Sequence, residues 1–400
     1  MVKDWKFVKI GELLDFKNGL NKGKDFFGSG TPIINYMDVY KKNGLHRSDI
    51  AGKVSLDEKE IERYEIRKGD VFFTRTSETP EEVGLASVML DDIDSCVFSG
   101  FVLRGRPKTD MLLPEYCKYC FSTHEVRQKI IASCTYTTRA LTNGTQLSKI
   151  EILVPNKEEQ FRIAASLTAV DQLIDKFEIL IRKYQSLKIA CLQHMFPRKG
   201  QTKPDARLPG FTGPWEQRKL GDFGAVAMCK RIFKDQTSEK GDIPFYKIGT
   251  FGGVPDAYIP RELFNEYKQM YPYPEKGDIL ISASGSIGRT VEYTGEDAYF
   301  QDSNIVWLRH DKSIVNLFLK YLYEVIQWAG IEGSTIKRLY NDNILTTEVM
   351  IPSVQEQEKI GAYLDSIDHL ITLHQRMCEK YKKIKQGMME ELLSGKIRLI

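Results

Sequence analysis

Apolar side chains recur at helical spacing along two long segments of the chain. In the first segment, residues separated by alternating steps of four and three are Ile163, Leu167, Val170, Ile174, Phe177 and Ile181. In the second segment, the corresponding residues are Ile360, Leu364, Ile367 and Ile371. This spacing is typical of the apolar seam of a coiled coil. The pattern therefore predicts two long helices whose seams face another helix.

Capping signals indicate where these helices begin and end. Asn156 and Ser353 are each followed three residues later by a glutamate, Glu159 or Glu356. Such a pair predicts a capping box, in which the glutamate reaches back to the first residue of the helix. Pro197 follows the end of the first predicted helix and Gly395 stands at the end of the second, as is typical of helix termination. We expect spacer helices over residues 156–196 and 353–395.

A second apolar row lies beside each seam. Its members are Leu173, Leu180 and Leu187 in the first helix and Leu370, Met377 and Ile384 in the second. One partner helix needs only the narrow seam. The second row predicts a further contact, either with the globular part of this chain or with another protein, and the sequence leaves both open.

The helices belong to a repeat of about half the chain. Glu159-Gln160 recurs as Glu356-Gln357, 197 residues later, and Lys68-Gly69-Asp70 recurs with a drifting offset as Lys276-Gly277-Asp278. Each helix follows a globular part, residues 1–155 or 215–352, with short strands and helices expected over 114–132 and 315–328. The irregular linker 197–214 is short, which favours antiparallel helices, and 396–400 forms a tail. The fold class is α+β, with two similar α/β globular domains joined by two long helices that form an antiparallel coiled coil.

Charge changes this picture only locally, because the net charge of the 400 residues is +3. A nucleic-acid-binding chain of this kind has to concentrate its basic residues in particular loops. Loops of the first half that combine basic, amide and hydroxyl side chains contain Lys17, Asn18, Lys22, Lys24, Arg75, Thr76, Ser77, Thr138 and Arg139. Those of the second half contain Lys230, Arg231, Lys234, Ser284, Ser286, Arg289, Lys337, Arg338 and Asn341. These side chains suit phosphates and base edges, and they are the predicted DNA-binding residues.

The sequence contains no motif for a catalytic or metal centre. The Asn-Pro-Pro-aromatic and Asp-Pro-Pro-Tyr motifs of amino-methyltransferases and the Walker A loop are absent. Cys117 and Cys120 form the only close cysteine pair, and no second pair stands at zinc spacing, so we expect them to face a core or a partner. No apolar run approaches the length of a membrane span, and the amino-terminal residues lack the apolar core of a signal peptide. We expect a cytoplasmic, non-catalytic protein without a metal or cofactor of its own.

The combination of these features resembles the specificity subunits of type I restriction–modification enzymes. The resemblance rests on the two similar halves, on the helices that begin near a Pro and Glu-Gln, and on local strings such as Met195-Phe196-Pro197 and Glu391-Leu392-Leu393-Ser394-Gly395. It covers essentially the whole chain. It implies two target-recognition domains, each reading one half of a bipartite asymmetric site in double-stranded DNA, and helices that set the spacing and bind two modification subunits. Those subunits would carry S-adenosylmethionine, and restriction subunits would use ATP and Mg²⁺.

Two other functions are compatible with parts of this pattern. A stand-alone DNA-modifying enzyme, such as a fused methyltransferase, would methylate DNA without a partner, and the absent catalytic motif argues against it. A coiled-coil scaffold without a DNA role would show no salt-sensitive binding to DNA.

Overall fold

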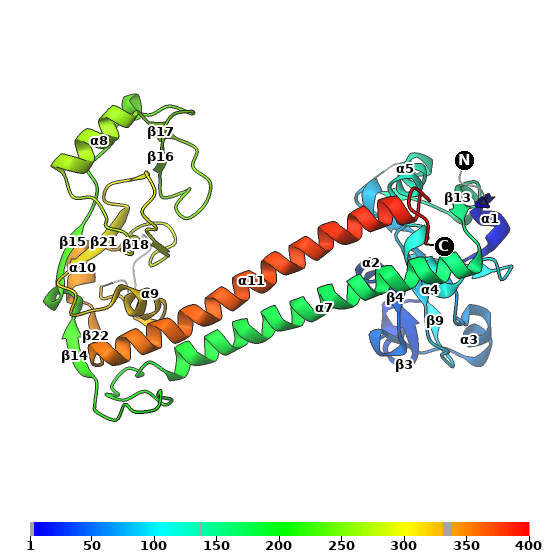
Figure 1. The fold of residues 1–400 in the computed structure, drawn as a ribbon. Coiled ribbons are helices and arrows are strands. Elements are labelled where there is room, and N and C mark those ends of the chain that lie inside the picture. The colour runs from blue at the N-terminus through cyan, green and yellow to red at the C-terminus, as the bar shows by residue number, and fades with distance from the viewer. Residues whose placement is uncertain (1–3, 137, 331–337, 400) are drawn as a thin grey trace. The chain divides into compact units, whose positions relative to one another are not determined.

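The computed structural model describes residues 4–136, 138–330 and 338–399. The chain divides into two compact units, Met1–Phe177 with Arg376–Ile400 and Glu178–Gln375. Each unit contains one globular domain, the first part of one long helix and the last part of the other (Figure 1). The predicted fold class, two mixed domains with two long paired helices, is confirmed by this arrangement.

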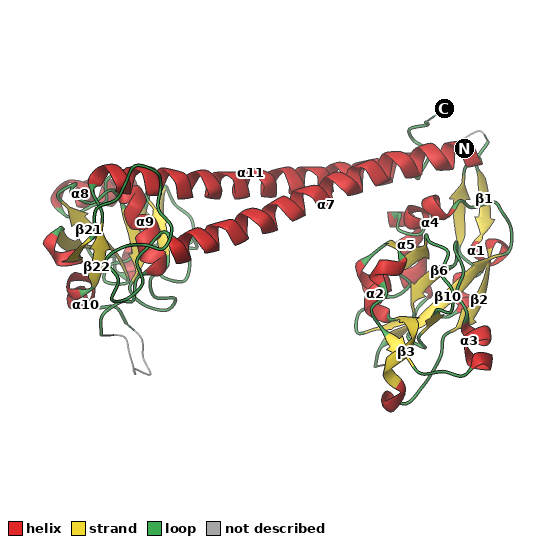
Figure 2. Ribbon diagram, turned by 90° about the horizontal axis from the view of Figure 1, so that it is seen from below, coloured by secondary structure: helices red, strands yellow, loops and turns green. Residues whose placement is uncertain are grey.

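The first domain is built around a five-stranded sheet. Figure 2 shows strands of this sheet side by side, with helices α4 and α5 beside them. The strand order is β2 (Leu14–Asn18), β10 (Val102–Pro107), β6 (Val71–Thr74), β8 (Ala86–Met89) and β4 (Gly44–Leu45). The smaller sheets are β5 (Lys53–Val54) with β3 (Phe27–Ile34) and β9 (Val97–Phe98), β11 (Thr135–Tyr136) with β12 (Ala140–Leu141) and β7 (Thr76–Ser77), and β1 (Lys6–Lys9) with β13 (Glu151–Val154). The helices are α1 (Ile10–Leu13), α2 (Tyr36–Lys41), α3 (Glu58–Tyr64), α4 (Pro114–Cys120), α5 (His124–Ser133) and α6 (Gly144–Leu147).

The second domain repeats this plan with different loops. Its main sheet has the order β15 (Gly224–Ala227), β21 (Ile305–His310), β18 (Ile279–Ser282) and β19 (Thr290–Glu292). The smaller sheets are β17 (Tyr258–Ile259) with β16 (Ile243–Tyr246) and β20 (Tyr299–Phe300), and β14 (Glu216–Lys219) with β22 (Glu348–Ile351). The helices are α8 (Arg261–Met270), α9 (Asn316–Val325) and α10 (Asn341–Thr346).

The repeated Lys-Gly-Asp tripeptide forms the same turn in both domains. Gly69 and Gly277 adopt φ angles of 85° and 95°, which a residue with a Cβ rarely adopts. The aspartate after each glycine accepts a hydrogen bond from a backbone N–H three residues earlier, that of Arg67 or Glu275. The turn leads into β6 or β18, whose side chains are buried on both faces because alternate residues pack into two different cores, as Phe72 and Phe73 do in β6.

The long helices α7 (Lys157–His194) and α11 (Val354–Leu392) pair in opposite directions within each unit. In the first unit, Phe177 stacks on Tyr381 with 5.6 Å between ring centroids. In the second unit, Tyr184 stacks on His374 at 5.5 Å. The beginning of one helix thus pairs with the end of the other, which is an antiparallel arrangement.

The seam residues near the helix starts belong to the domain cores as well. Ile163 and Leu167 are buried with Leu392 in the core of the first unit, and Ile360 and Leu364 are buried with Cys191 in a core of the second. The seam residues nearer the middle, Phe177, Ile181 and Ile371, are half-buried. Of the second row, Leu187 and Ile384 remain 40% and 39% exposed, so this chain does not cover that end of the row.

The predicted capping boxes are only half correct. The Asn156 side chain accepts a hydrogen bond from the Glu159 N–H at 2.9 Å, and Ser353 accepts one from the Glu356 N–H at 3.4 Å. The glutamate side chains do not reach back to the caps, because arginines bind them. Arg398 binds Glu159 at 2.5 and 2.8 Å, and Arg207 binds Glu356 at 2.7 Å through two nitrogens.

Two expected helices also differ in detail. The helix expected over 114–132 is interrupted between α4 and α5, where Thr123 begins α5 by capping the Val126 N–H at 3.3 Å. The helix expected over 315–328 ends at Val325. No helix among the described residues is both long enough and apolar enough to cross a membrane.

Candidate nucleic-acid interface

The first candidate surface for DNA recognition, called the first recognition surface below, comprises Arg75, Thr76, Phe101, Thr138 and Arg139. Arg75 and Thr76 leave the buried strand β6 and enter β7, which pairs with β12 through Leu141 opposite Thr76. Thr138 and Arg139 lie in the exposed turn that joins β11 to β12. Residues more than 60 positions apart in the sequence are thus brought to one small sheet. Its hydroxyl groups and guanidinium can address base edges and phosphates.

The loop that contains Phe101 lies beside this sheet. The Arg75 N–H donates to the Phe101 carbonyl at 3.0 Å, and the Arg75 guanidinium donates to the Gly100 carbonyl at 3.2 Å. Arg75 is half-buried, so part of this side chain supports the loop. The Phe101 side chain is 57% exposed. Ser77 is buried and bonds Glu82, which makes it a supporting residue within the turn.

The second recognition surface comprises Ser284, Ser286, Arg289, Asn304 and Arg338. Ser284 follows strand β18 as Thr76 follows β6, and it forms an isolated bridge with Arg338. The Ser284 hydroxyl contacts the Asn304 side chain at 2.8 Å, and the Arg338 guanidinium donates to the Ser303 carbonyl at 3.2 Å. Ser286 and Arg289 lie exposed on the turn that follows.

The two surfaces share a backbone scaffold. In the first, the Arg75 carbonyl accepts from the Thr142 N–H at 3.0 Å; in the second, the Ala283 carbonyl accepts from the Leu339 N–H at 2.8 Å. In both surfaces an arginine side chain donates to a carbonyl of the neighbouring loop. Arg75 is the residue whose carbonyl accepts the backbone hydrogen bond, whereas Arg338 adjoins Leu339, whose N–H donates it. Equivalent positions therefore carry different side chains on a common frame.

Three further predicted residues, Lys17, Lys22 and Arg231, contact other side chains or backbone of this chain. Lys17 donates to the Arg63 carbonyl, and burial together with the neighbouring Arg104 and Arg63 lowers the pKa of its ammonium group. Lys22 forms an ion pair with Glu60 at 2.7 Å. Arg231 pairs with Asp302 at 3.0 Å, on the loop of the second recognition surface.

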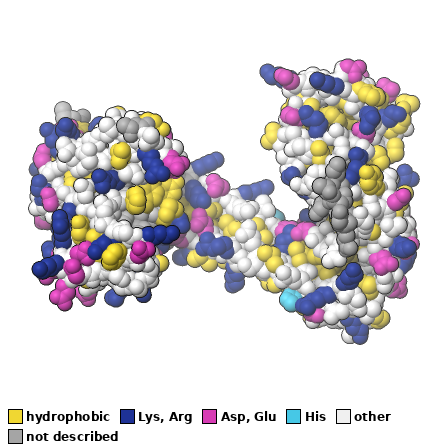
Figure 3. All heavy atoms as spheres, turned by 180° about the vertical axis from the view of Figure 1, so that it is seen from behind, with side chains coloured by type: hydrophobic (Ala, Val, Ile, Leu, Met, Phe, Trp, Pro, Cys, Tyr) yellow, Lys and Arg dark blue, Asp and Glu magenta, His cyan; other side chains and the backbone are white. Residues whose placement is uncertain are grey.

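The remaining predicted residues are exposed. They are Asn18 at the end of β2, Lys24 in a short 3-10 turn (Lys24–Phe26), Lys230 and Lys234 after β15, and Asn341 at the start of α10. Lys337 lies outside the described residues. On the face drawn in Figure 3, Lys and Arg side chains are interspersed with acidic and uncharged surface on both units, so positive charge is distributed and not gathered into one large patch.

Sequence reasoning missed the loops at Gly100–Phe101 and Ser303–Asn304. Both follow a two-residue strand, β9 or β20, that pairs in parallel with a neighbour, β3 or β16. An aromatic residue ends each of these strands, Phe98 or Phe300, and this repeated feature could have indicated equivalent loops. Within the described part of the chain, no group of three or more His, Cys, Asp or Glu side chains could hold a metal ion.

Comparison with known proteins decides between the interpretations. Residues 2–182 and 212–385 match the family described as type I restriction modification DNA specificity domain. The chain belongs to this family. Both halves match, and together the matched segments include both recognition surfaces and most of both long helices. The predicted family resemblance is thereby confirmed, and DNA target recognition in a type I restriction–modification system is the function of this family member.

Individual relatives agree with this assignment. A putative type I restriction enzyme specificity subunit of Haemophilus influenzae is 59% identical over 153 residues, 38% of this chain and 40% of that protein. A putative MjaX specificity subunit of Methanocaldococcus jannaschii is 23% identical over 99% of this chain and 94% of that protein. The fold is similar to that of the type I S subunit from M. genitalium, with a TM-score of 0.62 at 16% identity, covering 97% of this chain and 96% of that one.

Proposed function

We propose that each half of this specificity subunit reads one half of a bipartite, asymmetric site in double-stranded DNA. One observation carries the proposal: the two recognition surfaces have the same backbone scaffold and different side chains. Phe101 and Arg139 occupy the first, whereas Asn304 and Arg338 occupy the second. Different donors and acceptors select different base edges, so the two half-sites differ in sequence.

The two long helices set the spacing between the half-sites and dock two modification subunits. Ion pairs support a defined register, because Lys188 of α7 binds Asp368 of α11 at 3.0 Å and Lys385 of α11 binds Asp171 of α7 at 2.6 Å. Leu187 and Ile384 expose apolar surface on the helices, which suits contact with another protein.

Catalysis belongs to the partners in this proposal. The modification subunits bind S-adenosylmethionine and methylate the DNA, and restriction subunits, where present, use ATP and Mg²⁺ to move along it and cut it. This chain is non-catalytic and acts in the cytoplasm, where the DNA is. The absence of methyltransferase and Walker A motifs in the sequence supports this division of labour.

The test is reconstitution followed by sequencing of methylated DNA. We expect no methylation by the purified chain alone, and methylation of one bipartite site after a modification subunit is added. Exchange of one domain for that of another family member should change one half-site and leave the other as it was. Methylation by the chain alone, or a domain exchange that altered both half-sites, would overturn the proposal.

A further inference from the structure

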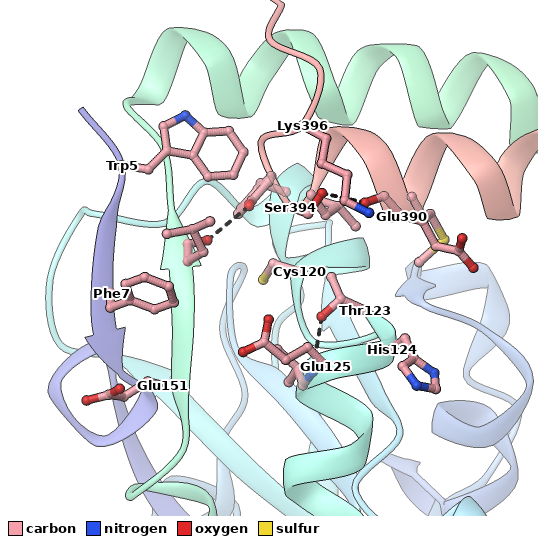
Figure 4. A pocket seen from close by; sticks show the side chains of 15 residues that line it. Trp5, Phe7, Cys120, Thr123, His124, Glu125, Glu151, Glu390, Ser394 and Lys396 are labelled. Atoms are coloured by element: carbon pink, nitrogen blue, oxygen red, sulfur yellow. Dashed lines mark hydrogen bonds between the residues drawn. The ribbon is translucent and has the colours of Figure 1, made fainter. Parts of the chain in front are cut away.

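A cavity of about 680 Å³ lies where the first domain meets the end of α11 (Figure 4). Trp5 and Phe7 line it from the strand side, Cys120 and Thr123 from the helix side, and Ser394 from the end of α11. None of the residues that line it belongs to the first recognition surface. The cavity is a feature of the junction between domain and helix, and the loops beside the recognition surfaces are the places where side chains can meet bases.

The loops at Gly100 and Ser303 share two backbone anchor points. The N–H groups of Ser99 and Gln301 donate to the last residue of β3 or β16, and the carbonyls of Phe101 and Asn304 accept from the residue after β6 or β18. Between these anchor points the first loop has one residue and the second loop has two, of which Asp302 is the first. The carboxylate of Asp302 therefore has no counterpart in the first loop.

Arg231 stands at the place that Asn21 takes in the first half. Lys17 and Ala227 lie on the same rung of their sheets, across β10 or β21 from the second residue of β6 or β18. The offset between them is 210 residues, and the 3-10 turns that follow, which both begin with Lys-Asp, have the same offset. Arg231 is therefore equivalent to Asn21, and the two halves present different polar side chains beside equivalent loops.

Arg231 is an exposed arginine that is held in a fixed direction. Cys229 and Ile232, on either side of it, are buried in a core of the second domain, so the backbone at Arg231 is fixed. The Arg231 Nε–H donates to the Asp302 carboxylate at 3.0 Å, while 62% of the Arg231 side chain remains exposed. Because this contact uses Nε, the fork formed by the two terminal nitrogens can point to solvent.

The turn that carries Asp302 is fixed as well. The Ile305 N–H donates to the Gln301 carbonyl at 3.1 Å, and the Arg338 guanidinium holds the Ser303 carbonyl at 3.2 Å. Ser303 adopts a φ angle of 53°, which is unfavourable for a residue with a Cβ, and such strained residues cluster at binding sites. The second recognition surface thus keeps a rigid pair of a guanidinium and a carboxylate at its edge.

This pair is complementary to a G·C base pair. In the major groove guanine presents two acceptors, N7 and O6, which match the fork of an arginine, and the paired cytosine presents an N4–H donor, which matches a carboxylate. A phosphate is a poor match, because the Asp302 carboxylate would repel it. An arginine whose direction is already fixed also loses less conformational entropy when it binds.

We propose that Arg231 reads a guanine of the second half-site through N7 and O6, and that Asp302 is the positioning residue that holds Arg231 for this contact. The inference rests on the proposed function and specifies it, since it assigns a G·C pair to the second half-site. In the first half Asn21 stands at the same place, and an amide suits adenine instead. The same position of the common frame thus selects different bases in the two half-sites.

The test changes the fork and the base edge separately, in the complex reconstituted with modification subunits. Arg231→Ala should relax the preference for guanine at one position of the second half-site, read by sequencing of methylated DNA, and weaken binding to the cognate site about tenfold or more. Arg231→Lys keeps the charge and loses the fork, so it should relax the same preference. Replacing that guanine by 7-deazaguanine, which lacks the N7 acceptor, should weaken binding by the unmodified complex and leave binding by the Arg231→Ala complex unchanged.

Asp302→Ala separates a base contact from a phosphate contact. If Arg231 reads guanine, loss of the orienting carboxylate should relax the preference at the same position. If Arg231 instead contacts a phosphate, loss of a negative charge should strengthen binding to all sequences, and this result would overturn the proposal. Asp297→Ala is the matched control, because Asp297 forms an exposed ion pair with Arg261 at 2.9 Å outside the recognition surface and should leave the preference unchanged.

The outcomes also separate this inference from the proposed function. If the reconstituted complex methylates no bipartite site, the proposed function fails. If it methylates one, and the Arg231→Ala chain, shown to be folded by thermal unfolding, keeps its preference at every position of the second half-site, only the assignment of Arg231 fails. A second half-site without any G·C pair would contradict the assignment as well.

Discussion

Lys188 of α7 and Asp368 of α11 form an ion pair of 3.0 Å, and the Tyr321 hydroxyl of the neighbouring domain donates to the same carboxylate at 3.0 Å. One side chain thus joins both helices to the second domain. The first unit repeats the arrangement, with Asp171 accepting from Lys385 at 2.6 Å and from the Tyr119 hydroxyl at 2.6 Å. Two aspartates at equivalent places therefore fix the register of helix against helix and of helix against domain.

Asp368→Asn should destabilise the second unit by about 1–3 kcal/mol, because a hydrogen-bonded charge is removed beside Lys188. We expect faster amide hydrogen exchange in α9 and in the adjacent part of α11, with the first unit unaffected. Asp365→Asn is the control, since Asp365 is more exposed and its contacts with Lys320 and the Tyr321 hydroxyl are longer, at 3.3 and 3.4 Å, so this change should cost about 0–1 kcal/mol. Equal effects of the two changes would contradict a special role for Asp368.

Acid should release the contact between Glu159 and Arg398. Burial opposes the charge on Glu159, but hydrogen bonds from Arg398 and Trp5 outweigh it and lower the pKa below its ordinary value of 4.5. A lowered pKa contributes stability above the ordinary value, and that stability is lost as the pH falls through the lowered one. Glu159→Gln keeps an acceptor for Trp5 and removes the charge. The unfolding temperature of the unmodified chain should therefore exceed that of Glu159→Gln at neutral pH, and the difference should shrink below about pH 4.5. A constant difference down to pH 3 would show that the ion pair is not the cause.

Changes at the first recognition surface should alter one half-site only. Arg139→Ala removes an exposed guanidinium that we assign to DNA, and it should cost about 1–3 kcal/mol of binding and relax the sequence preference at one or two positions. Arg75→Ala should also disturb the loop at Gly100, which Arg75 supports, and should therefore weaken recognition of the same half-site more broadly. Sequencing of methylated DNA tests both, and relaxed preference in both half-sites would argue against modular reading.

Exposed lysines outside the recognition surfaces should contribute to binding without regard to sequence. Lys24→Ala, Lys230→Ala and Lys234→Ala should each weaken binding to all DNA sequences and reduce the slope of log K against log salt by up to about one. Lys22→Ala should have a smaller effect, because Lys22 is already paired with Glu60. The measurement is a salt titration of DNA binding, and an unchanged slope in the triple mutant would place these loops away from DNA.

Insertion into the helices tests their role in spacing. Four residues inserted in α7 near Gln185, matched by four in α11 at the paired position, add about 6 Å of helix to each. The methylated site should keep both half-sites and gain one or two base pairs between them. Four residues are not a whole heptad, so the pairing of α7 with α11 must be distorted near the insertion. We therefore also expect lower affinity for DNA. A folded, active variant that kept the original spacing would exclude the helices as the ruler.

The long helices could be predicted from the sequence because their apolar periodicity is local. The spacing of four apolar residues predicts a buried helix face even when the partner helix is not known; they are Ile163, Leu167, Ile360 and Leu364. The role of Glu159 could not be predicted in this way. A capping box is a local pattern, but Arg398, which binds this glutamate, is 239 residues away, and only the folded chain brings the two together.

The recognition surfaces were predictable in part for the same reason. Thr76 and Arg139 stand out as polar residues in turns after strands, so composition alone selects them. Phe101 does not, because an aromatic residue at a strand start is more often buried, and its exposure depends on how the loop at Gly100 is held by Arg75. The sequence also could not distinguish Lys24, which is exposed, from Lys22, which is paired with Glu60 of α3.

The chain segments that make up each unit affect how the genes for such proteins can exchange parts by recombination. The second unit is one uninterrupted stretch, Glu178–Gln375, so a single recombination cassette with junctions inside the helices transfers it complete. The first unit is split in sequence, and a crossover that imports only its amino-terminal stretch leaves the resident Arg398 facing a newly acquired Glu159. Such a hybrid keeps the contacts between the two stretches only if this pair, and the pair of Lys385 with Asp171, can still form. New specificities can therefore spread by one-piece replacement of the second half, whereas replacement of the first half is filtered by the carboxyl-terminal residues of the recipient.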